Sequence, residues 1–229
     1  MLQSVHLISD SVFAKWTLAW AEQQENTKPL PFFKRDSAFQ QGVVLGHASA
    51  NLLFSTMGAS TVKIRFGLRQ DDQGAHHFEL LLFGVDNYGQ RLTPYFNPQA
   101  GEFSNAALTS GEQGNLPAEL AAQWKKHWQE KVLADEVTAA MFETPYGFLQ
   151  GYNYPLREFM EAVKPFASSP DVAISFGLHK YFGLPKEAHD TEGRLVYTFG
   201  LLFNAVAVGA ADPTDDVYFD LTAPCPRTC

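Results

Sequence analysis

The feature of this sequence that most constrains its fold is a set of short patterns that occurs twice, in the same order. Each half has two tryptophans in helical spacing, a segment that begins with Phe and ends in Gln-Gly, an alternating Val-x-Ile-x-Phe-Gly-Leu pattern and a Tyr-Phe pair. The matched segments are Trp16–Trp20 with Trp124–Trp128, Phe39–Gly42 with Phe148–Gly151, Val62–Leu68 with Val172–Leu178, and Tyr95–Asn97 with Tyr218–Asp220. The offset between partners only grows along the chain, as insertions in loops would produce. Such self-similarity is typical of a repeated structural unit, so we expect two tandem copies of one module.

The repeat also predicts the domain organisation. We expect a first module over residues 1–97, a linker over 98–115 that is rich in turn-forming residues, and a second module over 116–229. A chain of 229 residues can form one large domain or two small ones, and the two modules can pack as one domain. Because duplicated modules often correspond to the joined subunits of an isologous dimer, we expect a pseudo-two-fold relation between them.

Each copy begins with a predicted helix. In the second copy Pro117 suits the first turn of a helix, and Leu120, Trp124 and Trp128 recur on one face. The equivalent residues of the first copy are Val12, Trp16 and Trp20, after a capping Ser9 or Asp10. A short strand over 30–33 (140–142 in the second copy) and a second helix over 47–57 (from Pro155 in the second copy) are expected to follow.

The clearest predicted strand is Val62–Leu68, where apolar and polar residues alternate. Its counterpart, Val172–Leu178, has the same apolar residues but small residues between them. We therefore expect the polar face of the first strand to meet water or an anion and the corresponding face of the second to be covered. Strands over 78–85 and 196–208 are apolar on nearly every residue and should be buried on both faces. A last short strand carries each Tyr-Phe pair. The predicted fold class is therefore α+β, in two helix–strand–helix–antiparallel meander modules.

Composition narrows the possible partners. Hydrophobic residues make up 45% of the chain and charged residues 18%, which is enough for a substantial core. The formal net charge of -8 argues against nucleic acid or an anionic membrane as partner, since phosphate binding needs a basic surface. The N-terminus shows no signal peptide and no apolar run is long enough to span a bilayer, so we expect a cytoplasmic protein, monomeric or homodimeric. Its partner would be a protein or a small molecule.

Three segments together resemble a group of small uncharacterised bacterial proteins. These segments are the helix with the tryptophan pair, Leu80–Gly89, and the ending Tyr218–Cys229. Members of the group resemble a single copy of this module and end in a Tyr-Asp-Phe-Thr-x-Pro-Cys-Pro-x-x-Cys tail. This chain differs in carrying two copies, with the cysteine tail only on the second. The resemblance implies no activity, substrate or cofactor.

The two cysteines of the chain, Cys225 and Cys229, both lie in this tail. Two cysteines exclude a disulfide framework. A Cys-x3-Cys pair can be a redox couple or half of a metal site that other ligands complete. Alternatively, the tail is flexible and its thiols are inert.

Two further groups of residues are candidates for function. Lys63, Arg65 and Arg69 share one strand face, where they either bind an anion or an acidic partner or pair with carboxylates across the sheet. The second copy has an expanded loop between its two main strands, with Tyr181, Phe182, His189 and Asp190. Loops lengthened on a fixed scaffold often carry function. His76 and His77 are adjacent on a strand and so point to opposite faces, which disfavours joint chelation.

No nucleophile elbow, phosphate-binding loop, dinucleotide-binding or kinase motif is present. The sequence therefore assigns no catalytic residue and no cofactor. The function it favours is that of a non-enzymatic binding or interaction protein. The alternatives are a redox-sensing or metal-binding protein that acts through the tail, and an enzyme with a pocket between the repeats.

Overall fold

Helices and antiparallel sheets are interleaved along the chain, so the predicted class, α+β, is confirmed. The computed structural model describes residues 5–26, 28–35, 38–100, 116–144, 147–163, 171–183, 194–206, 219–220 and 223–225. The α-helices in these ranges are α1 (Asp10–Ala21), α2 (His47–Ser55), α3 (Ala118–Leu133) and α4 (Leu156–Val163). None of them combines the length and apolarity needed to cross a membrane.

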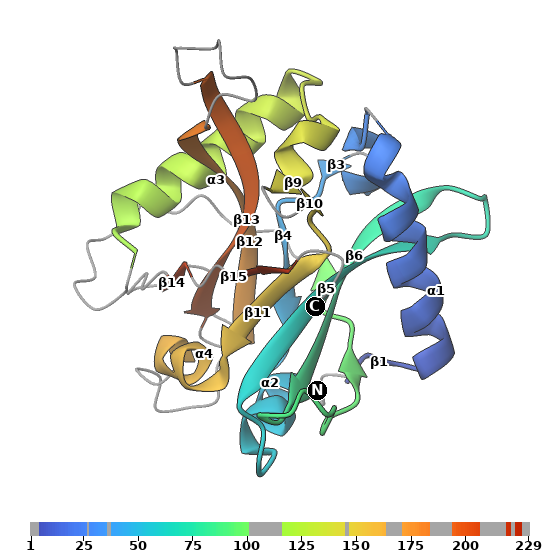
Figure 1. Ribbon diagram of the computed structural model, residues 1–229, viewed down its shortest axis with the longest axis vertical. Coiled ribbons are helices and arrows are strands. Elements are labelled where there is room, and N and C mark those ends of the chain that lie inside the picture. The colour runs from blue at the N-terminus through green and yellow to red at the C-terminus, as the bar shows by residue number, and fades with distance from the viewer. Residues whose placement is uncertain are drawn as a thin grey trace.

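Two larger sheets form the centre of the molecule. The first has six strands in the order β1-β7-β6-β5-β11-β15, and the second has five in the order β14-β13-β12-β4-β8. The strands of the first are β1 (Leu7–Ile8), β7 (Tyr95–Phe96), β6 (His76–Val85), β5 (Thr61–Gln70), β11 (Gly151–Pro155) and β15 (Ala223–Cys225). Those of the second are β14 (Phe219–Asp220), β13 (Arg194–Val206), β12 (Asp171–Gly183), β4 (Gly42–Leu45) and β8 (Gln99–Ala100). In Figure 1, α1 lies outside β5 and β6, and α3 lies outside β12 and β13 on the other side of the molecule.

Helices α1 and α3 each cover the outer face of one long hairpin. The side chain of Ser9 caps α1 by accepting a hydrogen bond from the Val12 amide at 3.3 Å. A Cβ placed on Gly67 would lie 3.1 Å from Cβ of Trp16, and one placed on Gly177 would lie 3.1 Å from Cβ of Trp124. The two glycines therefore allow each helix to approach its sheet closely, at matching points of the two halves.

Strands are exchanged between the two halves of the chain. Strand β4 comes from the first half but pairs with β12 of the second, and β11 comes from the second half but pairs with β5 of the first. The amide of Phe66 donates to the Gln150 carbonyl at 2.9 Å, and the amide of Phe176 donates to the Gln41 carbonyl at 2.8 Å. Each sheet therefore contains strands of both halves.

The side chains of two tryptophans make a second reciprocal pair of contacts. Trp20 Nε1 donates to the Leu149 carbonyl at 2.8 Å, and Trp128 Nε1 donates to the Gln40 carbonyl at 3.2 Å. Both indoles are fully buried. These bonds satisfy donors and acceptors in the core, where an unpaired polar group would be costly.

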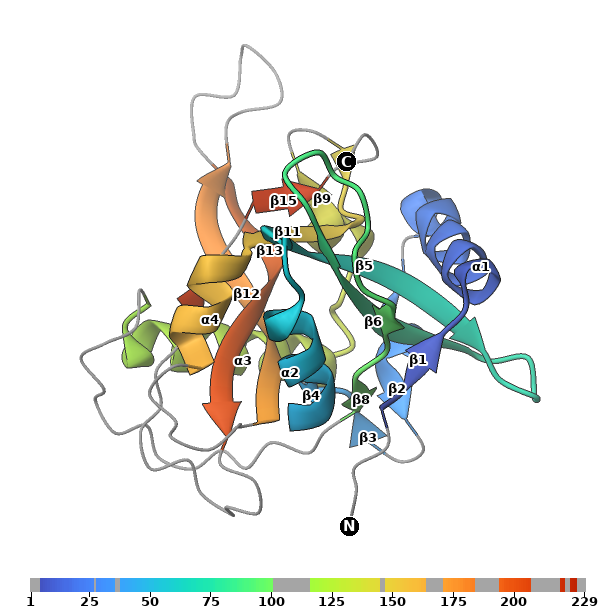
Figure 2. The ribbon, with the colours of Figure 1, turned by 90° about the horizontal axis from the view of Figure 1, so that it is seen from below.

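One hydrophobic core lies between the sheets and draws on both halves. Phe33 packs on Trp128 with ring centroids 4.9 Å apart, and Trp20 packs on Phe142 at 5.3 Å. In Figure 2, α2 and α4 lie side by side in front of the sheets, and the rings of Phe54 and Phe159 are 5.5 Å apart. Aromatic pairs at these distances stabilise a core beyond the area they bury.

Two predicted strands are wrong. Residues 30–33 and 140–142 belong to 3-10 helices, η2 (Leu30–Phe33) and η3 (Ala139–Phe142). In the first copy, Pro29 and Pro31 have φ fixed by the ring and donate no amide hydrogen bond to a ladder, which favours a tight turn over a strand. The small hairpins β2 (Lys34–Arg35) with β3 (Ala38–Phe39), and β9 (Glu143–Thr144) with β10 (Gly147–Phe148), follow these helices.

Other boundaries differ more modestly from the sequence-based prediction. Strands β4 and β11 were not predicted: β4 is an apolar run of four residues without alternation, and β11 is a five-residue segment that begins with glycine and ends with proline. Residues 99–100 of the expected linker form β8, and residues 101–115 lie outside the described part of the chain. The last predicted strand of the second copy is β14, and Tyr218 lies outside the described residues. Residues 78–85 are buried, as predicted for a strand covered on both faces.

Candidate functional site

Charged side chains gather at one end of the β5–β6 hairpin, on its outer face. In the strand register, Gly67 pairs with Glu79 and Arg69 pairs with His77. Glu79 is only 6% exposed, which is unusual for a carboxylate unless it is fully paired.

Glu79 is the centre of a network of four side chains. Arg69 Nε donates to its Oε1 at 2.8 Å, and Arg35 Nη2 lies 3.1 Å from the same oxygen. Asn97 Nδ2 donates to the other oxygen, Oε2, at 3.1 Å. The carboxylate therefore holds donors that come from β2, β5 and the segment after β7. We call Arg35, Arg69, His77, Glu79 and Asn97 the arginine cluster.

The cluster is braced by its surroundings. Arg35 Nη2 also donates to the Phe78 carbonyl at 2.6 Å, which places β2 against β6. His77 Nε2 lies 2.8 Å from Oδ2 of Asp71, and its Nδ1 lies 3.1 Å from the Lys34 carbonyl. The hydrogen bond from His77 lowers the pKa of Asp71 below the usual value for an aspartate. Asp71 is thus charged at neutral pH and engaged by the imidazole.

The charges in the cluster do not balance. Two guanidinium groups contact one carboxylate, and both are permanently protonated. The side chain of Arg69 remains 38% exposed and that of Arg35 19%. Nε of Arg35 is buried and has no hydrogen-bond partner. The cluster therefore has more positive charges than negative ones and more hydrogen-bond donors than acceptors, and both arginine side chains are partly accessible from solvent.

The matching positions of the second half carry different chemistry. In the register of β12 and β13, Gly177 pairs with Gly200 and His179 pairs with Thr198. Gly177, Gly200, His179 and Thr198 correspond in this order to Gly67, Glu79, Arg69 and His77 of the first half. The Arg69–Glu79 ion pair is therefore replaced by His179 next to Gly200. A Cβ placed on Gly200 would lie 2.2 Å from Nε2 of His179, which shows that the imidazole occupies the space that a side chain would need.

His179 is half-buried against α3. Its ring stacks on Trp124 with centroids 3.6 Å apart, and neither its Nε2 nor Thr198 Oγ1 has a hydrogen-bond partner. Burial lowers the pKa of His179 to about 4, because the charged form would lose its hydration. At these matched strand positions the second half is therefore uncharged, whereas the first half carries Arg69 and Glu79.

The three residues of the predicted basic face separate in the structure. Arg65 is buried and donates to the Tyr152 carbonyl at 3.3 Å and to Asn153 Oδ1 at 3.1 Å. The expectation that this strand face meets water or an anion is wrong at Arg65, because β11 pairs with that edge of β5. Lys63 is half-buried. Arg69 alone joins the arginine cluster.

The predicted loop and tail fall mostly outside the described residues. Tyr181 and Phe182 lie on β12, where they pair with Val196 and Leu195. His189 and Asp190 are outside the described part of the chain. Cys225 is the last residue of β15 and pairs with Gly151, whereas Cys229 is outside the described residues. Within the described ranges, no three His, Cys, Asp or Glu side chains are grouped so as to hold a metal ion.

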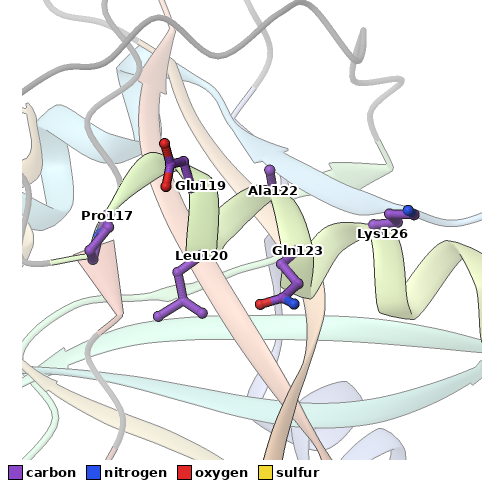
Figure 3. Close-up of a pocket in the computed structure, with 6 residues that line it drawn as sticks. All are labelled: Pro117, Glu119, Leu120, Ala122, Gln123 and Lys126. Atoms are coloured by element: carbon purple, nitrogen blue, oxygen red, sulfur yellow. The ribbon is translucent and has the colours of Figure 1, made fainter.

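A depression of about 500 Å³ lies along α3 on the second half (Figure 3). It is lined by Pro117, Glu119, Leu120, Ala122, Gln123 and Lys126. Leu120 and Gln123 project to one side of the helix and Glu119 to the other. Leu120 also packs against the small cluster that contains Trp124 and Leu202. The lining residues that the structure describes come from α3 and from Pro117 just before it, so within the described part of the chain no groups converge on the depression from separate elements.

Sequence reasoning missed Arg35, Glu79 and Asn97. Glu79 is the one acidic residue in the apolar run 78–85, and an isolated charge in a strand that should be buried is a signal that it has a partner. Arg35 and Asn97 gave no such signal, because only the tertiary fold brings them to β6.

The chain has no significant match among protein-family models, curated proteins or solved structures.

Proposed function

We propose that this chain is a non-enzymatic binding protein whose ligand-binding surface is the outer face of the first half around the arginine cluster. The observation that carries this proposal is the difference between the halves. Positions of matching register carry Arg69, His77 and Glu79 in one half and His179, Thr198 and Gly200 in the other. Because the second half builds the same hairpin without these charges, the fold does not require them.

We also propose that the halves arose by tandem duplication and are related by a pseudo-two-fold. The exchange of β4 and β11 supports this, as do the reciprocal indole hydrogen bonds of Trp20 and Trp128. The matching approach of Trp16 to Gly67 and of Trp124 to Gly177 supports it further. In an isologous dimer, contacts occur in such reciprocal pairs, and joining two subunits would preserve them.

The state of the charged groups favours binding over catalysis. A general acid or base needs a proton that it can exchange with a substrate. Glu79 instead accepts hydrogen bonds from Arg35, Arg69 and Asn97, and both ring nitrogens of His77 face hydrogen-bond acceptors. These groups fix one another in place, which suits a preorganised binding surface.

The centre of the molecule also favours binding over an enzyme with a pocket between the repeats. Where the described parts of the two halves meet, aromatic rings fill the space. Phe33 contacts Trp128 and Phe142, and Trp20 contacts Phe142 and Phe148. A ligand site is therefore better sought on an outer face.

Nuclear magnetic resonance with the full chain tests this proposal. Amide shifts are followed while a library of metabolites and short peptides is added at increasing concentration. We expect saturable shifts in residues 34–35, 69–79 and 97, with the ligand recovered unchanged. Residues 179–183 and 194–200 serve as the internal control, since they belong to the matching strands β12 and β13. Turnover of a ligand, or shifts confined to the second half, would contradict the proposal.

A further inference from the structure

We infer that the arginine cluster is a binding site for an oxyanion, the carboxylate or phosphate group of a ligand. This inference rests on the proposed function and adds the chemical class of the ligand. It follows from the donors that the cluster leaves unused, from its charge and from the way its side chains are held.

Unused donors are concentrated on Arg69. Its bond to Glu79 uses Nε alone, and no hydrogen bond to a described residue uses its two terminal nitrogens. The side chain is 38% exposed, so part of it is accessible to a ligand. A guanidinium presents its N–H groups in a planar fork that matches the spacing of two oxygens in a carboxylate or phosphate.

The charge of the site favours an anion. Arg35 and Arg69 together carry two positive charges against the single negative charge of Glu79. The charged carboxylate of Asp71, which lies 2.8 Å from His77, offsets part of this excess. Lys34, next to Arg35 in β2, is exposed and adds a cation at the rim. An anion would supply the missing negative charge and accept the free N–H groups.

The side chains of the site are preorganised by hydrogen bonds within the protein. Glu79 is 6% exposed and fixes Arg69, while the Phe78 carbonyl and Glu79 together fix Arg35. Asn97 also donates to the Leu80 carbonyl at 3.2 Å, which anchors it to β6. Long side chains normally lose rotamer freedom on binding, and here much of that loss has occurred on folding.

The second half is the natural comparison. Lys34 and Arg35 correspond to Glu143 and Thr144 in the matched small hairpins, and Arg69 corresponds to His179. That face therefore has no guanidinium among its matched positions, and burial keeps its histidine neutral. We expect one oxyanion site per chain rather than two.

The test is titration of the full chain by calorimetry with inorganic phosphate, a phosphomonoester and acetate, at constant ionic strength set with chloride. We expect one site per chain, with a dissociation constant on the order of 1 mM for the best of these small anions. Tighter binding of the phosphates than of acetate would identify a phosphate ligand, and the reverse a carboxylate.

Arg69→Gln should weaken binding by at least about tenfold, because it removes both the charge and the fork. Arg69→Lys keeps the charge and should give an intermediate affinity. Arg91→Gln is the matched control, since Arg91 lies in the same half and is also a partly exposed arginine paired with a carboxylate, Asp10, at 2.9 Å. We expect it to bind within about twofold of the unmodified chain. Circular dichroism establishes that each variant is folded.

Two results would overturn the inference. One is no saturable binding of any of the three anions to the unmodified chain, and the other is equal binding by Arg69→Gln. The failure of the inference is distinguishable from failure of the proposed function. Suppose that a neutral ligand shifts the amides of the arginine cluster equally in the unmodified chain and in Arg69→Gln. This result would refute an oxyanion as the ligand but would leave the proposed binding surface unaffected. Library ligands that leave the first half unshifted would refute both.

Discussion

Protonation of His179 should loosen the packing of α3 on the second sheet. The imidazole lies between Trp124 and Gly200 with no partner for Nε2, and burial lowers its pKa to about 4. The ordinary value of about 6.5 applies in the unfolded chain. Between these values the unfolded state binds more protons than the folded state, so stability rises with pH across this window.

The size of this effect follows from the two pKa values. At pH 7.5 His179 is neutral in both states and contributes no pH dependence. At pH 4.5 the linkage amounts to about 2.5 kcal/mol of lost stability, from the difference between a pKa of about 4 and one of about 6.5. The full loss below both values would be about 3.4 kcal/mol. Lys180 and Lys131, which lie near the ring of Tyr197, offer a charged His179 no compensation.

The assay is urea unfolding, followed by tryptophan fluorescence, at several pH values between 4.5 and 7.5. His179→Phe keeps an aromatic ring on Trp124 and cannot titrate. We expect it to lie within about 1.5 kcal/mol of the unmodified chain at pH 7.5, since the ring replacement is close to conservative in volume. At pH 4.5 the stability of His179→Phe relative to the unmodified chain should be about 2.5 kcal/mol higher than it is at pH 7.5. His6→Gln, at an exposed position of the first half, controls for the removal of a histidine as such.

Parallel stability curves for the unmodified chain and His179→Phe across this pH range would refute the reasoning. That result would mean that His179 is as well solvated in the folded chain as in the unfolded one. A gain of stability towards low pH in the unmodified chain relative to the variant would refute it more strongly, because it would require an acceptor for the charged ring.

Three further predictions concern the exchange of strands. Gly151→Ala should cost more than about 3 kcal/mol, because φ is +145° and the new Cβ would lie 2.0 Å from the Ile64 carbonyl oxygen; Gly89→Ala, with φ +81° and nothing within 4 Å, should cost only about 1 kcal/mol in the same denaturation assay. Trp20→Phe and Trp128→Phe should each cost about 1–3 kcal/mol, since each leaves a buried carbonyl of the other half without its donor, and similar losses measured by urea unfolding are the expected result. A chain cut within residues 101–115 should yield two fragments that fold only when mixed, as size-exclusion chromatography and circular dichroism would show; independent folding of either fragment would contradict the exchange of β4 and β11.

Much of the local structure could be predicted from the sequence because it depends on short-range patterns. The stripe of Trp16 and Trp20 and the capping Ser9 define α1, and the alternation from Val62 defines β5. The small residues of the second copy were correctly expected to be covered, since Gly177 lies under Trp124. In these elements, each residue's environment is set by neighbours within a few positions.

The candidate site was predicted only in part. Arg69 was singled out from its strand face, but the same reasoning placed Arg65 there, which the structure buries against Asn153. Which of two arginines on one strand stays accessible depends on the strand that pairs beside it. Here that strand, β11, comes from the other half of the chain, and a local sequence pattern does not predict that it pairs with β5.

The sequence by itself determined the repeated pattern, the α+β class and the helices and long strands that bury its aromatic residues. These follow from periodicity, which each segment carries within itself. Only the tertiary structure decided that β4 and β11 cross to the opposite half and that Arg35, Glu79 and Asn97 meet. The physical reason is that pairing between distant strands, and the burial of charges that it brings, depends on contacts between residues far apart in the chain. Two copies with nearly the same core pattern therefore carry an Arg69–Glu79 ion pair on one hairpin and the uncharged His179 and Gly200 at the matching positions of the other.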